Sequence, residues 1–291
     1  MSKAAGEDAP LGVAYTHCDA LVREHDRDRW LAALFAPADK RPHLHALHAF
    51  DHEVARVREV VSQPLPGEIR LQWWRDLLEG AAGGDGSANP VAAALLDTIE
   101  RFHLPAKALI DLVDARIFDL YDDPMPSLND LEGYCGETSS ALIRLVSLVL
   151  ADGEEPGGAE AAGHAGVAVG LTDLMRDLPR HAARGQVYLP ADLLNRHGVP
   201  PASVVAGEDG PALRAALGEL RRIAREHLER THALRRTIDA RIAPAFLQTA
   251  LAGLTLDRME RADYAPFRTR VDVPQWRKQW TLWREAHRTF A

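Results

Sequence analysis

Cysteine, excess positive charge and long apolar runs are all scarce in this sequence. Its 291 residues include two cysteines, Cys18 and Cys135, and no CxxC spacing. This argues against a disulfide framework or a thiolate zinc site, and it favours a reducing compartment. The most apolar stretch, Ala141 to Ala151, contains Arg144 and is too short to span a membrane. The first residues lack the apolar core of a secretory signal, so we expect a cytoplasmic protein.

The charge balance and composition narrow the functional classes further. The net formal charge is −8, which disfavours nucleic-acid binding because that binding relies on a basic surface. The thirteen histidines form no HExxH pattern, so they do not predict a metal site. Hydrophobic residues make up 46% and charged residues 26%, as is typical of a globular protein. We expect one domain over residues 1–291, with residues 1–13 as a flexible tail.

Apolar residues recur at helical spacing along nearly the whole chain. No β-branched run alternates long enough to predict a sheet. Proline, glycine and capping residues divide the pattern into about ten helices, and helices of this length can surround a central cavity. The predicted helices span residues 15–35, 42–61, 66–82, 90–102, 105–121, 127–150, 160–183, 211–239, 242–262 and 275–291.

Two segments carry motifs. From Gly170 the sequence is GLTDLMRDLPRHAARGQVYLP, and from His48 it is HAFDHEVARVREVVSQPLPGEIRLQWWRDLL. The first resembles the hallmark segment of squalene and phytoene synthases, in which an Asn precedes an Arg-Asp pair, a second Asp follows four residues later, and Arg-Gly and Tyr-Leu-Pro come next. The resemblance covers most of the chain. It implies an all-α, isoprenoid-synthase-type helical bundle around a central cavity.

The activity of that family explains what its motifs do. Its enzymes join two prenyl diphosphates head to head, beginning with the loss of a diphosphate that carries several negative charges. Mg²⁺ neutralises such a leaving group while a few carboxylates hold the metal. Two Asp-rich motifs on facing helices supply these carboxylates, and aspartates four residues apart lie on one helix face.

In the second motif of this chain, Asp177 keeps the first aspartate, and His181 stands where the second belongs. Asp173 occupies the position of the Asn, so Asp173 and Asp177 form a carboxylate pair one turn earlier than usual. This pair is a candidate for holding one Mg²⁺. The alternative is a solvated helix face on which Arg176 and Arg180 are the partners.

The first motif departs further from the family pattern. Alignment of Ala46 to Phe50 places Ala55, Arg56 and Glu59 at the aspartate region. A methyl group cannot bind a metal, so Glu59 remains as the third candidate metal ligand. Arg56 puts positive charge where Mg²⁺ belongs, with a repulsion of about 4 kcal/mol between unit charges 4 Å apart at an effective dielectric near 20. A direct contact between Arg56 and a diphosphate stays open.

These departures resemble one branch of the family, which includes the mitochondrial factor needed to assemble respiratory complex I and its bacterial relatives. The branch implies a non-catalytic protein that acts in complex I assembly at or near the inner membrane. It would contact complex I subunits or assembly proteins, and its cavity is a candidate site for an isoprenoid or lipid. The alternatives are an Mg²⁺-dependent prenyltransferase acting on prenyl diphosphates, and a helical scaffold with a filled core. A long apolar cavity is expected for the lipid-binding protein and not for the scaffold.

Further site residues follow from the same resemblance. The candidate diphosphate contacts are Arg56, Arg176, Arg184 and Tyr188. For Tyr188 the alternative is a buried tyrosine with a backbone partner, and for Arg184 it is the basic end of a helix. The candidate cavity-lining residues are Phe50, Val54, Tyr134, Thr138 and Leu142.

The C-terminal segment 275–291 predicts an amphipathic helix. Trp276, Trp280 and Trp283 share one face with His287 and Phe290, and the other face is basic. Tryptophan together with basic charge suits a helix that lies on an anionic membrane surface. The alternative is a helix that packs its three tryptophans into the bundle.

Overall fold

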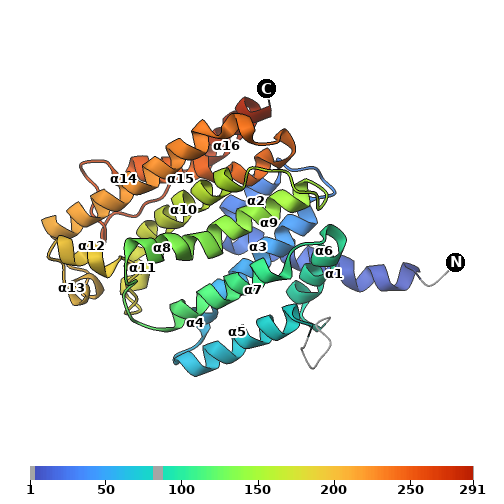
Figure 1. The fold of residues 1–291 in the computed structure, drawn as a ribbon, viewed down its shortest axis with the longest axis horizontal. Helices are drawn as coiled ribbons and strands as arrows, with labels where there is room; N and C mark the ends of the chain where they lie inside the picture. The colour runs from blue at the N-terminus through green and yellow to red at the C-terminus, as the bar shows by residue number, and fades with distance from the viewer. Residues whose placement is uncertain (1–3, 81–87, 291) are drawn as a thin grey trace.

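The computed structural model describes residues 4–80 and 88–290 (Figure 1). Within these ranges every regular element is a helix, so the all-α prediction is confirmed. The α-helices are α1 Ala4–His25, α2 Arg27–Ala33, α3 Arg41–Ala55, α4 Val57–Val60, α5 Pro64–Leu78, α6 Pro90–Phe102, α7 Ala106–Ala115, α8 Leu128–Cys135, α9 Ala141–Leu150, α10 Ala159–Arg176, α11 Leu178–Ala182, α12 Ala191–Arg196, α13 Pro201–Val205, α14 Pro211–Ala233, α15 Gln248–Met259 and α16 Gln275–Phe290. The tighter 3₁₀ turns are η2 Arg116–Leu120, η4 Arg235–Thr237 and η5 Ala240–Phe246, and η3 Gly136–Ser140 is a π-helical turn.

The predicted tail, residues 1–13, overlaps the start of α1 at Ala4, and residues 1–3 lie outside the described residues. Among the helices of residues 4–80 and 88–290, none combines the length and the apolar character that crossing a membrane requires.

Three predicted helices are each interrupted by a short break. The break between α1 and α2 falls at Asp26, whose side chain accepts a hydrogen bond from the Arg29 amide and caps α2. The break between α3 and α4 falls at Arg56. The break between α10 and α11 falls at Asp177, because Pro179 lacks the amide hydrogen that a continuous helix needs. The continuous helices predicted from apolar spacing at these places were wrong.

Helices α3 and α10 occupy the middle of the bundle. Helix α3 packs against α1, α6 and α9, and α10 packs against α14, α15 and η3. Small residues allow α10 to approach η3 closely: a Cβ on Gly166 would overlap Ser140, and one on Gly170 would lie 2.7 Å from the Cys135 sulfur. The facing ends of α3–α4 and α10–α11 are the two elements that carry the motif positions.

Helices α5 and α16 lie at opposite edges of the molecule (Figure 1). Helix α16 packs against α15, η5 and α2, and it buries Leu282 and Ala286 in that contact. Helix α5 packs on one side against α7 and η2. Each of the two helices therefore has an inner face in the bundle and an outer face toward solvent.

Candidate functional site

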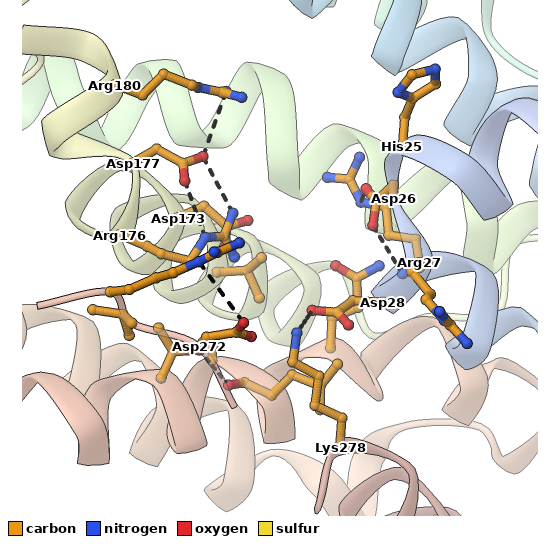
Figure 2. Close-up of a pocket in the computed structure, with 18 of the residues that line it drawn as sticks. His25, Asp26, Arg27, Asp28, Asp173, Arg176, Asp177, Arg180, Asp272 and Lys278 are labelled. Carbon is orange, nitrogen blue, oxygen red and sulfur yellow. Dashed lines mark hydrogen bonds and ion pairs between the residues drawn. The ribbon is translucent and has the colours of Figure 1, made fainter. Parts of the chain in front are cut away.

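A polar cavity of about 820 Å³ opens where the three helix breaks meet. Asp26, Arg56 and Asp177, the residues at the breaks, all line it. Figure 2 shows Asp173, Arg176, Asp177 and Arg180 on one side and the start of α2 on the other. Eight cationic side chains and six carboxylates line the cavity: Arg27, Arg29, Arg56, Arg176, Arg180, Arg268, Arg270, Lys278, Asp26, Asp28, Glu59, Asp173, Asp177 and Asp272.

The carboxylates of the second motif are held by an arginine of their own helix. Arg176 donates to Asp173 at 2.7 Å and to Asp177 at 3.2 Å (Figure 2). Burial alone would raise the pKa of Asp177, but Arg176 outweighs it and holds that pKa below its ordinary value. The arginine partners predicted as one alternative are present, because Arg180 also lies 3.6 Å from Asp177. Arg176 is therefore engaged by carboxylates rather than held free for a diphosphate.

The surviving acid of the first motif is paired across the cavity. Arg184 donates to Glu59 at 2.8 Å, and Arg180 lies 3.6 Å from the same carboxylate. Burial raises the pKa of Glu59, but the hydrogen bond from Arg184 and the charge of Arg180 lower it overall. These pairs connect α4 to α11 and to the loop after it. Arg56 lies at the cavity wall, 3.6 Å from Glu53 of α3.

Mg²⁺ does not fit this arrangement. Ala55 offers no donor atom, and burial lowers the pKa of His181 to about 4, so that position supplies a neutral ring instead of a carboxylate. The remaining acids, Glu59, Asp173 and Asp177, each have a guanidinium as partner. Over the described ranges, no three His, Cys, Asp or Glu side chains converge in a way that could hold a metal ion. Arg180 lies 3.6 Å from Glu59 and 3.6 Å from Asp177, so an arginine connects the acids of the two motifs.

Beside this polar cavity lies a smaller pocket of about 140 Å³, whose walls include Tyr134, Thr138 and Tyr188. The Tyr188 hydroxyl donates to Asp119 at 2.7 Å, and the Tyr134 hydroxyl donates to the same carboxylate oxygen at 2.8 Å. The predicted alternative of a backbone partner for Tyr188 was wrong, because its partner is a side-chain carboxylate. Arg116 donates to the Tyr134 oxygen at 2.7 Å and so joins the cluster.

The cluster continues into a chain of alternating charges. Asp51 accepts from Arg116 at 3.0 Å and from Arg29 at 2.5 Å, and Asp51 and Asp119 are each 4% exposed. Burial alone would raise the pKa of Asp51, but Arg29 and Arg116 outweigh it and lower that pKa to about 2. We call Arg29, Asp51, Arg116 and Asp119, with Tyr134 and Tyr188, the buried network.

Sequence reasoning missed the charged members of this network. Asp51 follows the buried run from His43 to Phe50, but that run contains three histidines, so its sequence did not indicate a buried acid. Asp119 and Arg116 lie in the tight turn η2, outside any recognised motif, and nothing in their spacing pointed to Asp51.

The predicted cavity-lining residues fall into different surroundings. Leu142 lines an apolar recess of about 20 Å³ beside the polar cavity, far below the 300–1,000 Å³ that is usual for a ligand pocket. The Thr138 hydroxyl donates to the Tyr134 carbonyl at 2.6 Å. Phe50 packs edge to face with Trp74 in the core, and Val54 is buried in the same core. At these predicted positions side chains therefore fill the interior, and the space beside Leu142 is limited to that small recess.

The tryptophans of α16 face solvent. Trp276, Trp280 and Trp283 are 68%, 56% and 45% exposed, and the rings of Trp280 and Trp283 stack with their centroids 5.0 Å apart. The alternative in which α16 packs these side chains into the bundle was wrong, because Leu282 and Ala286 fill that contact.

Comparison with known proteins agrees with the helical fold that surrounds the site. A dehydrosqualene synthase structure aligns over 96% of this chain and 97% of its own, with a TM-score of 0.80 and 20% identity, so the fold is that of the isoprenoid synthases. Residues 22–284 match the squalene/phytoene synthase family. The chain belongs to that family, as the motif segments predicted.

Relatives of two kinds resemble it. The human protein "NADH dehydrogenase (ubiquinone) complex I, assembly factor 6" is 30% identical over 251 residues, which are 86% of this chain and 75% of that protein. The 15-cis-phytoene synthase of Synechococcus elongatus is 26% identical over 291 aligned positions, with 94% of this chain and 92% of that protein covered.

Proposed function

We propose that this protein is a non-catalytic member of its family that acts in the assembly of respiratory complex I. The observation that carries the proposal is the pairing of every surviving motif acid with an arginine of the same chain. Glu59, Asp173 and Asp177 are each paired with Arg184 or Arg176, and these pairs support a site that does not bind the metal that ionisation of a diphosphate needs. The likeness to complex I assembly factor 6 supplies the role.

The test compares assembly with catalysis in the same set of variants. In cells that lack the gene, the unaltered protein should restore assembled complex I on native gels, together with NADH oxidation by membranes. Asp177→Ala should restore it equally well, because the proposed role does not use this carboxylate as a metal ligand. The proposal would be refuted by loss of assembly in Asp177→Ala at an unchanged melting temperature.

A second candidate is the Mg²⁺-dependent condensation of prenyl diphosphates, and one observation favours it: Asp173 and Asp177 both face the polar cavity with Arg56 opposite. Purified protein would be incubated with farnesyl diphosphate, with and without Mg²⁺, and extracted for hydrocarbons. A triterpene or tetraterpene that forms only with Mg²⁺ would establish catalysis. We expect none, since the apolar recess beside Leu142 is too small for a prenyl chain.

We further propose that the outer face of α16 contacts an anionic membrane surface. It presents Trp276, Trp280 and Trp283, and Arg277 and Arg284 are exposed on the same helix. Interfacial tryptophans insert at the headgroup level while arginines attract anionic lipids. This arrangement would place the protein at the inner membrane as a peripheral component.

Vesicle flotation tests this contact. Substituting all three tryptophans of α16 by serine should lower binding to phosphatidylglycerol vesicles by about tenfold or more, since each large side chain contributes roughly 1.5–3 kcal/mol when buried. Trp73→Ser, at a half-exposed tryptophan of α5, is the matched control and should bind as the unaltered protein does. Equal flotation of both variants would argue against the membrane contact.

A further inference from the structure

An exposed apolar surface covers the outer side of α5, at the edge of the molecule opposite α16 (Figure 1). Leu65, Ile69 and Trp73 are 64%, 62% and 38% exposed and lie four residues apart, so they form one stripe along the helix. Val60 at the end of α4 is 47% exposed and extends the surface. Neighbouring exposed side chains of this size are unusual on a protein that has no partner.

The stripe borders a groove between α3–α4 and α5. The groove measures about 440 Å³ and is lined by Glu53, Arg56, Val57, Val60, Arg70, Trp73, Trp74 and Asn89. Its apolar floor is rigid, because Trp74 is buried edge to face against Phe50 in the core. Trp73 in turn lies edge to face on Trp74, with ring centroids 4.9 Å apart. An incoming side chain therefore meets a preformed surface that loses little conformational entropy on binding.

The charges at the rim decide what this groove accepts. Arg70 is exposed, and no carboxylate pairs with it among residues 4–80 and 88–290. Arg56 on the facing wall is 3.6 Å from Glu53 at the edge of ion-pair range. This rim is positive on a chain whose net charge is −8. Acidic side chains on either side of an apolar helix face would complement it.

Two other occupants fit less well. A second copy of the chain would offer α5 or α16 as its exposed apolar helix, and these carry Arg70 or Arg277 and Arg284, which would repel Arg56 and Arg70. A membrane is flat, so it could contact Leu65 and Ile69 on the outer side of α5 but would not enter the groove beside Trp73 and Val60.

We infer that the groove between α3–α4 and α5 binds an acidic amphipathic helix of a partner protein. Two or three apolar side chains of that helix, spaced three or four residues apart, would enter the groove beside Trp73 and Val60. Its carboxylates would meet Arg56 and Arg70 at the rim. This is the helix-in-groove mode of recognition, and it requires neither a ligand in the polar cavity nor the membrane contact of α16.

The probe is a pair of fluorescently labelled helical peptides of about five turns, with identical Leu and Ile positions and either Glu or Lys on the flanks. Fluorescence anisotropy with the full-length protein should show the Glu peptide binding at least about tenfold more tightly than the Lys peptide. Trp73→Ala should weaken the Glu peptide by a similar factor. Trp280→Ala, at an exposed tryptophan of α16, is the matched control and should leave binding unchanged.

Charge reversal supplies the decisive variant. Arg70→Glu, at an exposed position that should not disturb folding, should weaken the Glu peptide and strengthen the Lys peptide. Equal affinities for the two peptides, or a preference that Arg70→Glu leaves unchanged, would overturn the inference. So would a dimer in sedimentation velocity that Ile69→Glu dissociates, or vesicle binding that Ile69→Glu abolishes, because these results would assign the surface to a second copy or to lipid. None of these measurements depends on the complex I assay, so the groove and the assembly role can fail separately.

Discussion

The polar cavity and the buried network lie side by side and share Arg29, yet their ion pairs differ in kind. At the cavity, Arg176 and Arg184 hold carboxylates that are about a third exposed, between 29% and 39%. In the network, Asp51 and its two arginines have side chains between 6% and 16% exposed. Water screens the first set, so each pair adds little stability. The second set is withdrawn from water, so removal of one member leaves an uncompensated charge. The cavity can thus change without unfolding the bundle, and the network cannot.

The largest expected effect is at Asp51. Asp51→Ala leaves Arg29 and Arg116 buried without their shared carboxylate, and we expect the free energy of unfolding to fall by about 3–5 kcal/mol. Urea denaturation followed by circular dichroism measures this. Glu59→Ala removes an acid that also has two arginines near it, but at the exposed cavity, and serves as the control. A loss below about 1 kcal/mol in Asp51→Ala would erase the distinction between the two regions.

The hydrogen bond from Tyr188 to Asp119 comes next. Tyr188→Phe keeps the ring and removes one donor to a buried carboxylate, which should cost about 1.5–3 kcal/mol in urea denaturation. Tyr121→Phe is the comparison, since Tyr121 is 42% exposed and its hydroxyl donates to Glu68 at the surface. If the two variants were equally stable, the Tyr188 ring would only fill space in the network, and its hydroxyl would not stabilise the Asp119 carboxylate.

Acid should weaken the network as well. The pKa of Asp51 is lowered from 3.8 to about 2 in the folded protein, so its contribution is present above pH 4 and is lost as the pH falls from about 4 toward 2. That contribution amounts to about 2 kcal/mol. The measurement is the difference in unfolding free energy between the unaltered protein and Asp51→Asn. This difference should shrink across that pH interval, and a constant difference would contradict the lowered pKa.

The smallest effect is expected from the cavity pairs and from metal. Arg184→Gln should change the free energy of unfolding by less than about 1 kcal/mol. Millimolar Mg²⁺ should leave the melting temperature of the unaltered protein where it is, since a ligand stabilises only a state that binds it. A rise in melting temperature with Mg²⁺ that Asp177→Ala removes would show that the carboxylates do reach a metal.

The all-α class of the fold could be predicted from the sequence. The positions at which three of the helices are interrupted could not. Apolar spacing predicted the helices, but the predicted helices ran without interruption through Asp26, Arg56 and Asp177. At these residues the chain turns and the cavity opens. Periodicity measures which face is buried, and it says nothing of where a polar residue stops the helix. A capping Asp26 and Pro179 after Asp177 were the available local signals.

For the site, the sequence indicated candidate acids but not the partners that they contact. Motif positions identified Glu59, Asp173 and Asp177 as candidate residues. Ala55 and His181, which stand where the family has aspartates, argued against metal binding. Which arginine would meet which acid depended on tertiary distances, as for Arg184 and Glu59, which are 125 residues apart in sequence. The pairing of Asp51 with Arg116 could not be predicted either, because Arg116 lies in the turn η2, which matches no recognised motif.

The arginines at the cavity have a consequence beyond stability. A metal ion dissociates, exchanges with the cell's supply and keeps open coordination positions where a phosphate can join it. A guanidinium on the same chain is a tethered counter-ion whose effective concentration does not fall on dilution. Its hydrogen bonds are directional, and those of Arg176 and Arg184 to Asp173, Asp177 and Glu59 stay within the chain. If no metal binds here, chelators should leave this protein unchanged, and an anion that enters the cavity would compete with Asp173, Asp177 or Glu59 for Arg176 and Arg184.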